Sequence, residues 1–166
     1  AALDTRLPMV VDADALNILA ADPLMHTDWI LTPHPGEAAR MLGMSKEEIQ
    51  TDRFAAVHEL VASFGGVCVL KGAGTLVASL YDGVVSVCDR GNPGMASGGM
   101  GDVLTGVIAG LRAQGLISPV AARLGVWAHA AAGDDAAQSG EIGVLASDLL
   151  PHIRTRLNRL VRYADR

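Results

Sequence analysis

Short apolar runs alternate with stretches of helical spacing along the earlier part of the chain. Three apolar runs bounded by turn residues predict brief strands, at residues 7–11, 29–31 and 67–70. The fully apolar run at residues 67–70 is typical of a strand that is covered on both faces. Between these runs, apolar residues recur three and four positions apart, which predicts helices at residues 13–21, 36–42 and 46–64. Ser45 and Glu48 have the spacing of a capping box at the start of the last of these helices. This part of the chain is therefore predicted to alternate strands with helices.

The later part of the chain changes from a pair of strands to helices. Residues 75–80 and 84–87 flank the turn sequence Tyr81-Asp82-Gly83 and predict an antiparallel hairpin. The apolar spacing is then helical to the end, which predicts three helices separated by glycine-containing turns, at residues 98–115, 119–137 and 144–161. Strands that alternate with helices, followed by helices that cover the sheet, indicate a layered α/β domain with a mixed sheet.

Composition and charge narrow the class of partner. Apolar residues make up 50% of the 166 residues and charged residues 19%, which indicates one globular domain with a core. The formal net charge of -5 and a pI near 5.4 provide no basic field for a nucleic-acid backbone, so we expect no nucleic-acid partner. No apolar run approaches the roughly 20 residues of a membrane-spanning helix, so we expect no membrane partner. A small-molecule ligand agrees better with these values.

The cysteines and the beginning of the chain bear on its cellular context. Cys68 and Cys88 lie in apolar runs and are too few for a disulfide framework, which indicates reduced thiols and a cytoplasmic location. The chain begins without Met and has no basic segment ahead of an apolar one, so we expect no secretory signal there. We interpret residues 1–166 as the later part of a longer chain.

The densest chemical signal is the glycine-rich segment GNPGMASGGMGD at residues 91–102. Glycines in this number cost backbone entropy, which is typical of a main chain that approaches a ligand closely. The helix that follows presents free N–H groups and a positive dipole end, which suit a phosphate or a developing anion. Asp102, beside Gly101, can take the proton of a substrate hydroxyl as that hydroxyl attacks phosphorus. The alternative is that Asp102 caps the helix and the glycines serve tight packing.

A second signal, KGAGT at residues 71–75, directly follows the predicted strand at residues 67–70. Small residues at a strand end can place main-chain amides and one lysine charge against phosphates, at the edge where open sheets bind ligands. The Walker pattern GxxxxGK[ST] is absent from the chain. A glycine-rich entry to a hairpin with a solvated lysine also explains the segment, so both interpretations stay open.

Polar residues also follow the first two predicted strands. Two prolines hold His34 rigidly before a helix, so His34 is a candidate for a hydrogen bond to substrate, with a purely structural hydrogen bond as the alternative. Glu37 favours the helix start through the helix dipole. For Asp12 and Asp14 we favour helix capping over ligand binding, and the role of Asn17 stays undecided.

The helical stretch near the end of the chain contains His129, Asp134 and Asp135. Their spacing suggests a metal site, but no second His or Cys completes it, so we favour a histidine that packs between helices. The metal ligands of the protein stay unknown. Cys68 and His58 have no context that would activate a nucleophile, so acyl-transfer chemistry is not expected.

Three segments in this order, LTPHPGE, LKGAGT and GNPGMASGGMGDVLTGVIAGL, resemble the ribokinase-like family and, within it, the ADP/ATP-dependent NAD(P)H-hydrate dehydratases. The most specific match is Gly99-Met100-Gly101-Asp102. The resemblance identifies residues 1–166 as the later portion of one nucleotide-binding domain. It implies a layered α/β/α fold, incomplete at the N-terminal side, with a mostly parallel sheet and an antiparallel hairpin. The family usually has Thr or a small residue at position 100, so we expect Met100 to point away from the anion site.

The resemblance also implies a reaction and the residues that perform it. Hydrated NADH or NADPH is dehydrated by phosphoryl transfer from ADP or ATP to the ring hydroxyl and loss of phosphate, which leaves AMP or ADP as the other product. Mg²⁺ is expected with the nucleotide phosphates. Asp102 is implied as the catalytic base and as a substrate contact, and His34 as a second substrate contact. The residues implied in nucleotide binding are Lys71, Gly72, Ala73, Gly74, Thr75 and Gly101.

Two alternatives from other classes stay open. One is a ribokinase-like kinase of a small alcohol or vitamin precursor, which would leave a stable phosphorylated product. The other is a non-catalytic nucleotide-binding remnant. For the whole protein, the resemblance further implies a homo-oligomer and an epimerase domain earlier in the full-length chain.

Overall fold

The computed structural model describes residues 7–164 of the chain. It contains a five-stranded sheet in which the strands follow their order in the sequence. The strands are β1 (Met9–Val11), β2 (Trp29–Leu31), β3 (Val67–Leu70), β4 (Leu76–Ser79) and β5 (Val85–Val87). β1, β2 and β3 pair in parallel, whereas β3, β4 and β5 pair antiparallel. The predicted mixed sheet with an antiparallel hairpin is therefore confirmed.

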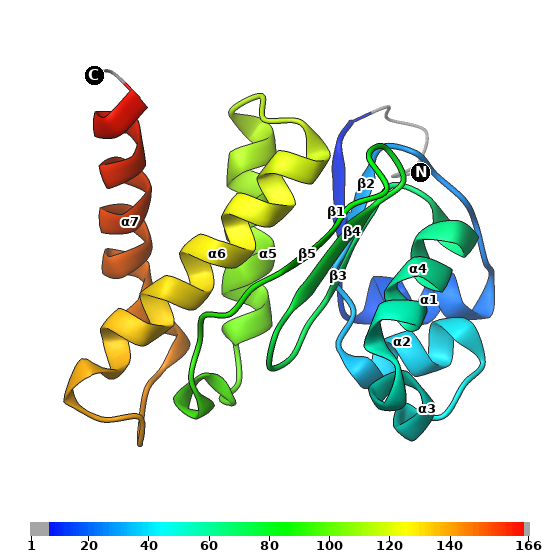
Figure 1. The fold of residues 1–166 in the computed structure, drawn as a ribbon, viewed down its shortest axis with the longest axis horizontal. Helices are drawn as coiled ribbons and strands as arrows, with labels where there is room; N and C mark the ends of the chain where they lie inside the picture. Colours follow the sequence, from blue (N-terminus) through cyan, green and yellow to red (C-terminus); the bar gives the residue numbers. More distant parts are fainter. Residues whose placement is uncertain (1–6, 165–166) are drawn as a thin grey trace.

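Helices cover both faces of this sheet (Figure 1). On one side lie α1 (Asp14–Ala21), α2 (Pro35–Leu42), α3 (Lys46–Thr51) and α4 (Arg53–Phe64). On the other side lie α5 (Met100–Ala113) and α6 (Ser118–Ala136), with α7 (Leu149–Ala164) beyond α6. Each side buries its own apolar cluster against the sheet. β2 and β3 are buried along their whole length, which explains why their sequences are continuously apolar.

The predicted helix at residues 46–64 is two helices. Its start is as expected, because Ser45 Oγ accepts from the Glu48 N–H at 3.1 Å and Glu48 Oε2 accepts from the Ser45 N–H at 2.7 Å. The interruption is at Asp52, whose Oδ1 accepts a hydrogen bond from the Ala55 N–H at 2.9 Å. A short acidic side chain competes with the helical backbone in this way and begins a new helix. The helix therefore ends as α3 and restarts as α4.

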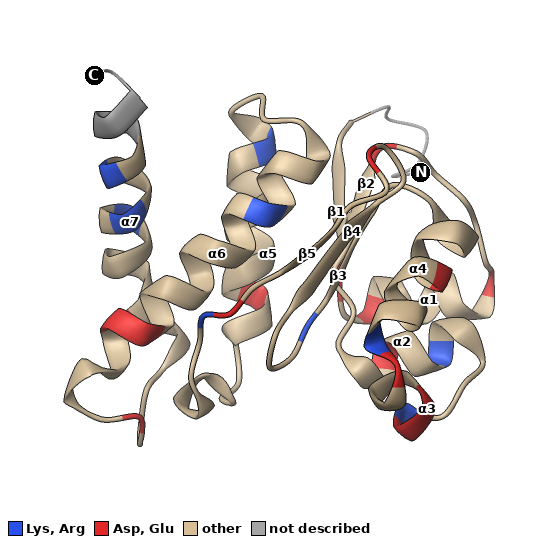
Figure 2. Ribbon diagram, in the orientation of Figure 1, with Lys and Arg blue, Asp and Glu red and all other residues tan. Residues whose placement is uncertain are grey.

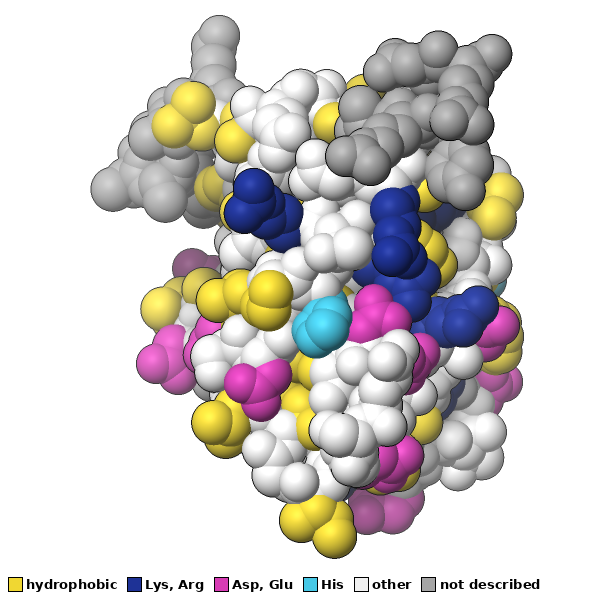
Figure 3. All heavy atoms as spheres, turned by 90° about the vertical axis from the view of Figure 1, so that its left-hand side faces the viewer, with side chains coloured by type: hydrophobic (Ala, Val, Ile, Leu, Met, Phe, Trp, Pro, Cys, Tyr) yellow, Lys and Arg dark blue, Asp and Glu magenta, His cyan; other side chains and the backbone are white. Residues whose placement is uncertain are grey.

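The last helix begins later than the predicted range 144–161. A 3₁₀ turn at Ala146–Asp148 precedes it, so the regular helix is α7. The Arg156 side chain donates two hydrogen bonds to the Asp135 carboxylate, at 2.7 and 2.6 Å, which ties α7 to α6. Figure 3 views the face that carries α7, where charged and apolar side chains alternate in small groups. None of the described helices is long and apolar enough to cross a bilayer.

The parallel part of the sheet determines where polar residues gather. Parallel strands have their carboxyl ends at one edge, and here Asp12 follows β1, Thr32 follows β2 and Lys71 follows β3. Elsewhere, acidic and basic residues are spread over the helices on both sides of the sheet (Figure 2). The carboxyl edge of the sheet is therefore where a functional site is expected.

Candidate functional site

A cavity of about 600 Å³ lies at the carboxyl end of β3. Four segments line it: the loop after β3, the glycine-rich loop after β5, the start of α5 and one face of α6. The two loops lie side by side at the lower edge of the sheet in Figure 1. The lining includes Lys71, Gly72, Ala73, Gly74, Thr75, Gly91, Asn92, Gly101 and His129. The two glycine-rich segments that the sequence singles out separately thus meet at one cavity.

The first turn of α5 faces this cavity with free main-chain donors. Gly99 precedes the helix with φ of 85°, a conformation that favours glycine, and no side chain caps the helix start. Gly101 lines the cavity, so the uncapped N–H groups and the positive end of the helix are available to an anion. The site therefore has the main-chain geometry of a phosphate-binding helix start.

Asp102 follows Gly101 in this first turn. Its side chain is exposed, and among the described residues its carboxylate makes no hydrogen bond or ion pair. Asp102 therefore does not cap α5. Asp102 is not one of the residues that line the cavity, although its neighbour Gly101 is, so Asp102 lies beside the cavity rather than within it. An exposed, unpaired carboxylate in this position is available to a second molecule.

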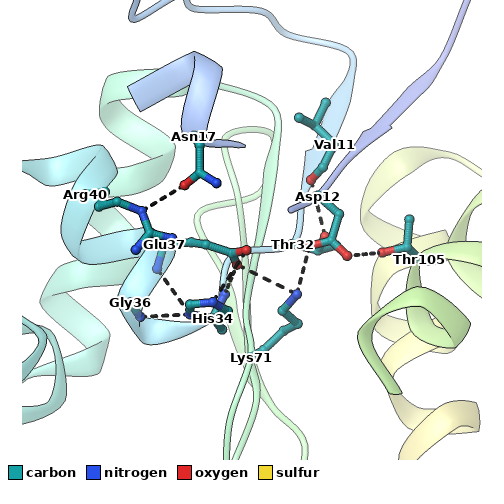
Figure 4. A network of polar contacts seen from close by, with 10 residues as sticks. All are labelled: Val11, Asp12, Asn17, Thr32, His34, Gly36, Glu37, Arg40, Lys71 and Thr105. Atoms are coloured by element: carbon teal, nitrogen blue, oxygen red, sulfur yellow. Dashed lines mark hydrogen bonds and ion pairs between the residues drawn. The ribbon is translucent and has the colours of Figure 1, made fainter. Parts of the chain in front are cut away.

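Lys71 lies against the start of α5 and is held by two carboxylates (Figure 4). Its Nζ is 2.8 Å from Asp12 Oδ1 and 3.8 Å from Glu37 Oε2. A Cβ added at Gly101 would lie 3.4 Å from Lys71 Nζ, so the ammonium and the helix start are in close approach. The interpretation of Lys71 as a solvated charge is wrong, because its side chain is only 19% exposed and is paired.

The capping role favoured for Asp12 and Asp14 is also wrong. The residue before α1 is Ala13, and no side chain accepts a hydrogen bond from the helix start. Asp12 instead bonds across the sheet edge to Lys71, and its Oδ2 accepts a hydrogen bond from Thr105 Oγ1 at 2.7 Å. Burial alone would raise the pKa of the Asp12 carboxyl, but the hydrogen bonds from Lys71 and Thr105 hold that pKa below its usual value. Asp12 is therefore an ionised part of the site.

His34 has a structural role at the start of α2. Its Nδ1 accepts hydrogen bonds from the N–H groups of Gly36 at 2.9 Å and Glu37 at 3.2 Å, and Glu37 Oε2 accepts from the His34 N–H at 2.7 Å. This reciprocal pattern is a capping box in which a ring nitrogen replaces the usual oxygen. The ring is half exposed and is not among the residues that line the cavity.

Asn17, undecided from the sequence, connects the two helices beside this region. Its Oδ1 accepts a hydrogen bond from Arg40 Nε at 2.8 Å. The bond joins α1 to α2 (Figure 4). The contact is structural and leaves Asn17 outside the cavity lining.

His129 is a residue of the cavity rather than of a helix contact alone. It lies on α6, is 7% exposed and lines the cavity. Its Nε2 is buried and has no hydrogen-bond partner among the described residues. Burial lowers the pKa of the His129 imidazole to about 4, although the Met100 backbone acts in the opposite direction. The residue is therefore neutral near pH 7.

This neutral histidine predicts a pH dependence of stability. Between about pH 6.5 and about pH 4 the unfolded chain binds a proton at His129 that the folded chain does not bind. The free energy of unfolding therefore falls as the pH is lowered through this window, by up to about 3 kcal/mol from this residue. Urea unfolding at a series of pH values should show a flatter acid limb in His129→Gln. The exposed His58→Gln is the control, and equal slopes in wild type and His129→Gln would contradict the assignment.

The glycine-rich loop is held on α6 by a carboxylate and a methionine. Asp134 accepts hydrogen bonds from the Gly91 N–H at 3.1 Å and from Asn92 Nδ2 at 3.2 Å. Met95 fills the notch at Gly133, where an added Cβ would lie 2.2 Å from its sulfur. Asp134, considered from its spacing as a metal ligand, is thus an anchor for the loop.

Within residues 7–164 no group of three His, Cys, Asp or Glu side chains could hold a metal ion.

Met100 is buried in the apolar cluster between α5, α6 and α7, although part of it also lines the cavity. Most of the Met100 side chain is therefore buried in this cluster, away from the N–H groups at the start of α5.

The layered sheet, with its cavity at the carboxyl ends of parallel strands, is the fold of the ribokinase-like superfamily. A family model described as NAD(P)H-hydrate dehydratase matches residues 1–155. The chain belongs to this NAD(P)H-hydrate dehydratase family.

Individual relatives agree with this assignment. The chain is 54% identical over 157 residues to a bifunctional NAD(P)H-hydrate repair enzyme from Coxiella burnetii, covering 94% of this chain and 32% of that protein. It is 46% identical over 166 residues to an ADP-dependent (S)-NAD(P)H-hydrate dehydratase from Neisseria meningitidis, covering 95% and 56%. A Bacillus subtilis ADP/ATP-dependent NAD(P)H-hydrate dehydratase, co-crystallised with ATP and Mg²⁺, matches with a TM-score of 0.78 and 33% identity, over 93% of this chain and 58% of that chain. The chain thus spans less than two thirds of each of these proteins.

Proposed function

We propose that the protein containing this chain is a nucleotide-dependent dehydratase that restores hydrated NADH or NADPH. One observation carries the proposal: both glycine-rich loops and the uncapped start of α5 line a single cavity, with the Lys71 ammonium against Gly101. Main-chain N–H groups and a fixed cation in this arrangement suit the phosphates of ADP or ATP. Membership of the NAD(P)H-hydrate dehydratase family supports the same substrate class.

The proposed chemistry assigns Asp102 to the acceptor and the cavity to the nucleotide. Asp102 takes the proton of the ring hydroxyl while that oxygen attacks the terminal phosphorus, and AMP or ADP leaves. The C–O bond then breaks with loss of phosphate, driven by the lone pair of the ring nitrogen, and loss of a ring proton restores the double bond. The nucleotide-binding groups are Lys71, Gly72, Ala73, Gly74, Thr75 and Gly101.

Mg²⁺ fits this site as an ion carried by the nucleotide. The described residues provide no three-ligand group of their own, and Mg²⁺ is commonly held by substrate phosphates and one or two carboxylates. The ion supplies neutralisation of phosphate charge when bound.

The direct test is turnover by the full-length protein. Hydrated NADH, ADP and Mg²⁺ are mixed with it, and absorbance of the reduced cofactor is followed, with ATP in a parallel assay. We expect absorbance to return with at least one nucleotide. No recovery with either would contradict the proposal, and a stable phosphorylated product would indicate a kinase instead.

His34 is proposed as a contact to the hydrated ring, and its capping role must be separated from that contact. Asn also caps helices well, so His34→Asn retains the helix start but removes the imidazole. We expect KM for the hydrate to rise about tenfold in His34→Asn while thermal stability stays close to wild type. In His34→Ala about 1 kcal/mol of stability is lost as well. An unchanged KM in His34→Asn would leave His34 with its capping role alone.

The remaining expectations concern the whole polypeptide. We infer that residues 1–166 form the later portion of one nucleotide-binding domain, in keeping with the share of each relative that the chain spans. The bifunctional name of the Coxiella burnetii relative supports a second activity in the full-length protein. We propose that this second activity is an epimerase domain earlier in the full-length chain. A homo-oligomeric state and a cytoplasmic location stay predictions from the sequence, testable by light scattering and by fractionation.

A further inference from the structure

A buried charged cluster lies directly behind the candidate phosphate site. Lys71 Nζ is between Asp12 Oδ1 at 2.8 Å and Glu37 Oε2 at 3.8 Å, and the Lys71, Asp12 and Glu37 side chains are 19%, 10% and 7% exposed. Charges withdrawn from water to this extent depend on their partners, because each has lost most of its hydration. The two carboxylates approach the ammonium from different sides (Figure 4). The position of Lys71 is therefore set by a balance between them.

Asp12 contacts α5 as well as Lys71. Its Oδ2 accepts the hydrogen bond of Thr105 Oγ1 at 2.7 Å. Gly101 lies four residues before Thr105, on the same face of α5, and a Cβ at Gly101 would be 3.8 Å from Asp12 Oδ2. One carboxylate thus joins the ammonium to the first two turns of the helix.

We propose that Asp12 is a positioning residue that fixes the Lys71 ammonium against the first turn of α5. The ammonium and the N–H groups beside Gly101 then face the same phosphate. The inference rests on the proposed function, because the phosphate belongs to its nucleotide. A lysine has a flexible four-carbon stem, and holding it before the ligand arrives removes the entropy cost of ordering it on binding.

Position and charge predict opposite effects of removing the Asp12 carboxylate. As a negative charge alone, Asp12 repels phosphate, so its loss would tighten nucleotide binding. As a positioning group it keeps Lys71 beside Gly101, and without it Glu37 is the carboxylate that remains and draws the ammonium toward α2. Asp12→Asn and Glu37→Gln make the same change in charge with little change in shape. Only the first releases Lys71 from α5.

The experiment compares ADP binding by these variants of the full-length protein with Mg²⁺, using calorimetry. We expect the Kd for ADP to rise about tenfold in Asp12→Asn. In Thr105→Val we expect a rise of about threefold, because Asp12 keeps its contact with Lys71 but loses the hydrogen bond from Thr105. In Glu37→Gln the Kd does not rise. NMR of protein labelled with ¹³C at lysine Cε gives a direct readout, with a shifted Lys71 signal in Asp12→Asn and an unchanged signal of the exposed Lys46. Lys71→Arg and Lys46→Arg assign the two signals.

Several outcomes would overturn the inference. Tighter ADP binding in both Asp12→Asn and Glu37→Gln would show that charge, not position, governs the site, and an unmoved Lys71 signal in Asp12→Asn would also contradict it. If Asp12→Asn fails to fold by circular dichroism, Thr105→Val decides, and an unchanged Kd there rejects the inference. Wild type that binds neither ADP nor ATP contradicts both this inference and the proposed function. ADP binding with the expected variant effects but no hydrate turnover contradicts the proposed function alone.

Discussion

Asp102→Asn is expected to lower turnover of hydrated NADH about a thousandfold, because an amide cannot accept the hydroxyl proton as oxygen attacks phosphorus. The substitution is nearly isosteric, and the carboxylate makes no hydrogen bond or ion pair among the described residues. We therefore expect stability to fall by no more than about 1 kcal/mol, the part that the helix dipole contributes. ADP affinity should stay within about twofold of wild type, because the proposed phosphate-binding groups are main-chain N–H groups and Lys71 rather than Asp102. Steady-state rates and calorimetry on the same preparation measure both quantities.

The matched control for this variant is Asp22→Asn. Asp22 is an exposed aspartate at the end of α1, outside the cavity lining, so it undergoes the same change in charge without the proposed chemistry. Full turnover in Asp22→Asn together with the expected loss of turnover in Asp102→Asn would support Asp102 as the catalytic base. An unchanged rate in Asp102→Asn would remove Asp102 from the mechanism.

Lys71→Ala is expected to weaken ADP binding about a hundredfold. The loss has two causes: the phosphate loses its cation, and the buried carboxylates of Asp12 and Glu37 are left without their shared partner. We therefore also expect the free energy of unfolding to fall by about 2 kcal/mol, less than for a fully buried pair because these groups retain some exposure. Calorimetry with ADP and urea unfolding measure the two effects.

Lys46→Ala separates this expectation from a general effect of removing positive charge. Lys46 is the other lysine of the chain and is exposed at the start of α3. Its substitution should leave ADP affinity as in wild type. Equal ADP affinities for wild type and Lys71→Ala would discard the role of Lys71 in nucleotide binding.

Local patterns predicted most elements of the fold. The apolar runs at β2 and β3 and the turn before β5 carry their own signals, because burial on both faces and tight turns restrict the residue types that fit. The prediction was less accurate at helix ends. Asp52 divides one apolar repeat into two helices, because a side-chain hydrogen bond to Ala55 competes with the helical backbone.

Local sequence patterns predicted only part of the candidate site. The glycine-rich loops stood out because their composition is costly without a ligand. The sequence favoured a capping role for Asp12 and a packing role for His129, because each residue considered alone resembles common structural cases. Asp134, which clamps Gly91, carried no signal that distinguishes an anchor from a metal ligand.

From the sequence alone, the strand–helix alternation, the hairpin and the two glycine-rich loops of this protein were determined, since each depends on residues close together along the chain. Only the tertiary structure decided that Lys71 pairs with Asp12, 59 residues away, and that Asp12 bonds Thr105, 93 residues away. Such contacts depend on which strand ends meet at the edge of the sheet. Hydrophobic periodicity specifies which face of an element is buried but not which polar group lies opposite, because that pairing is set by the packing of the whole sheet and its helices.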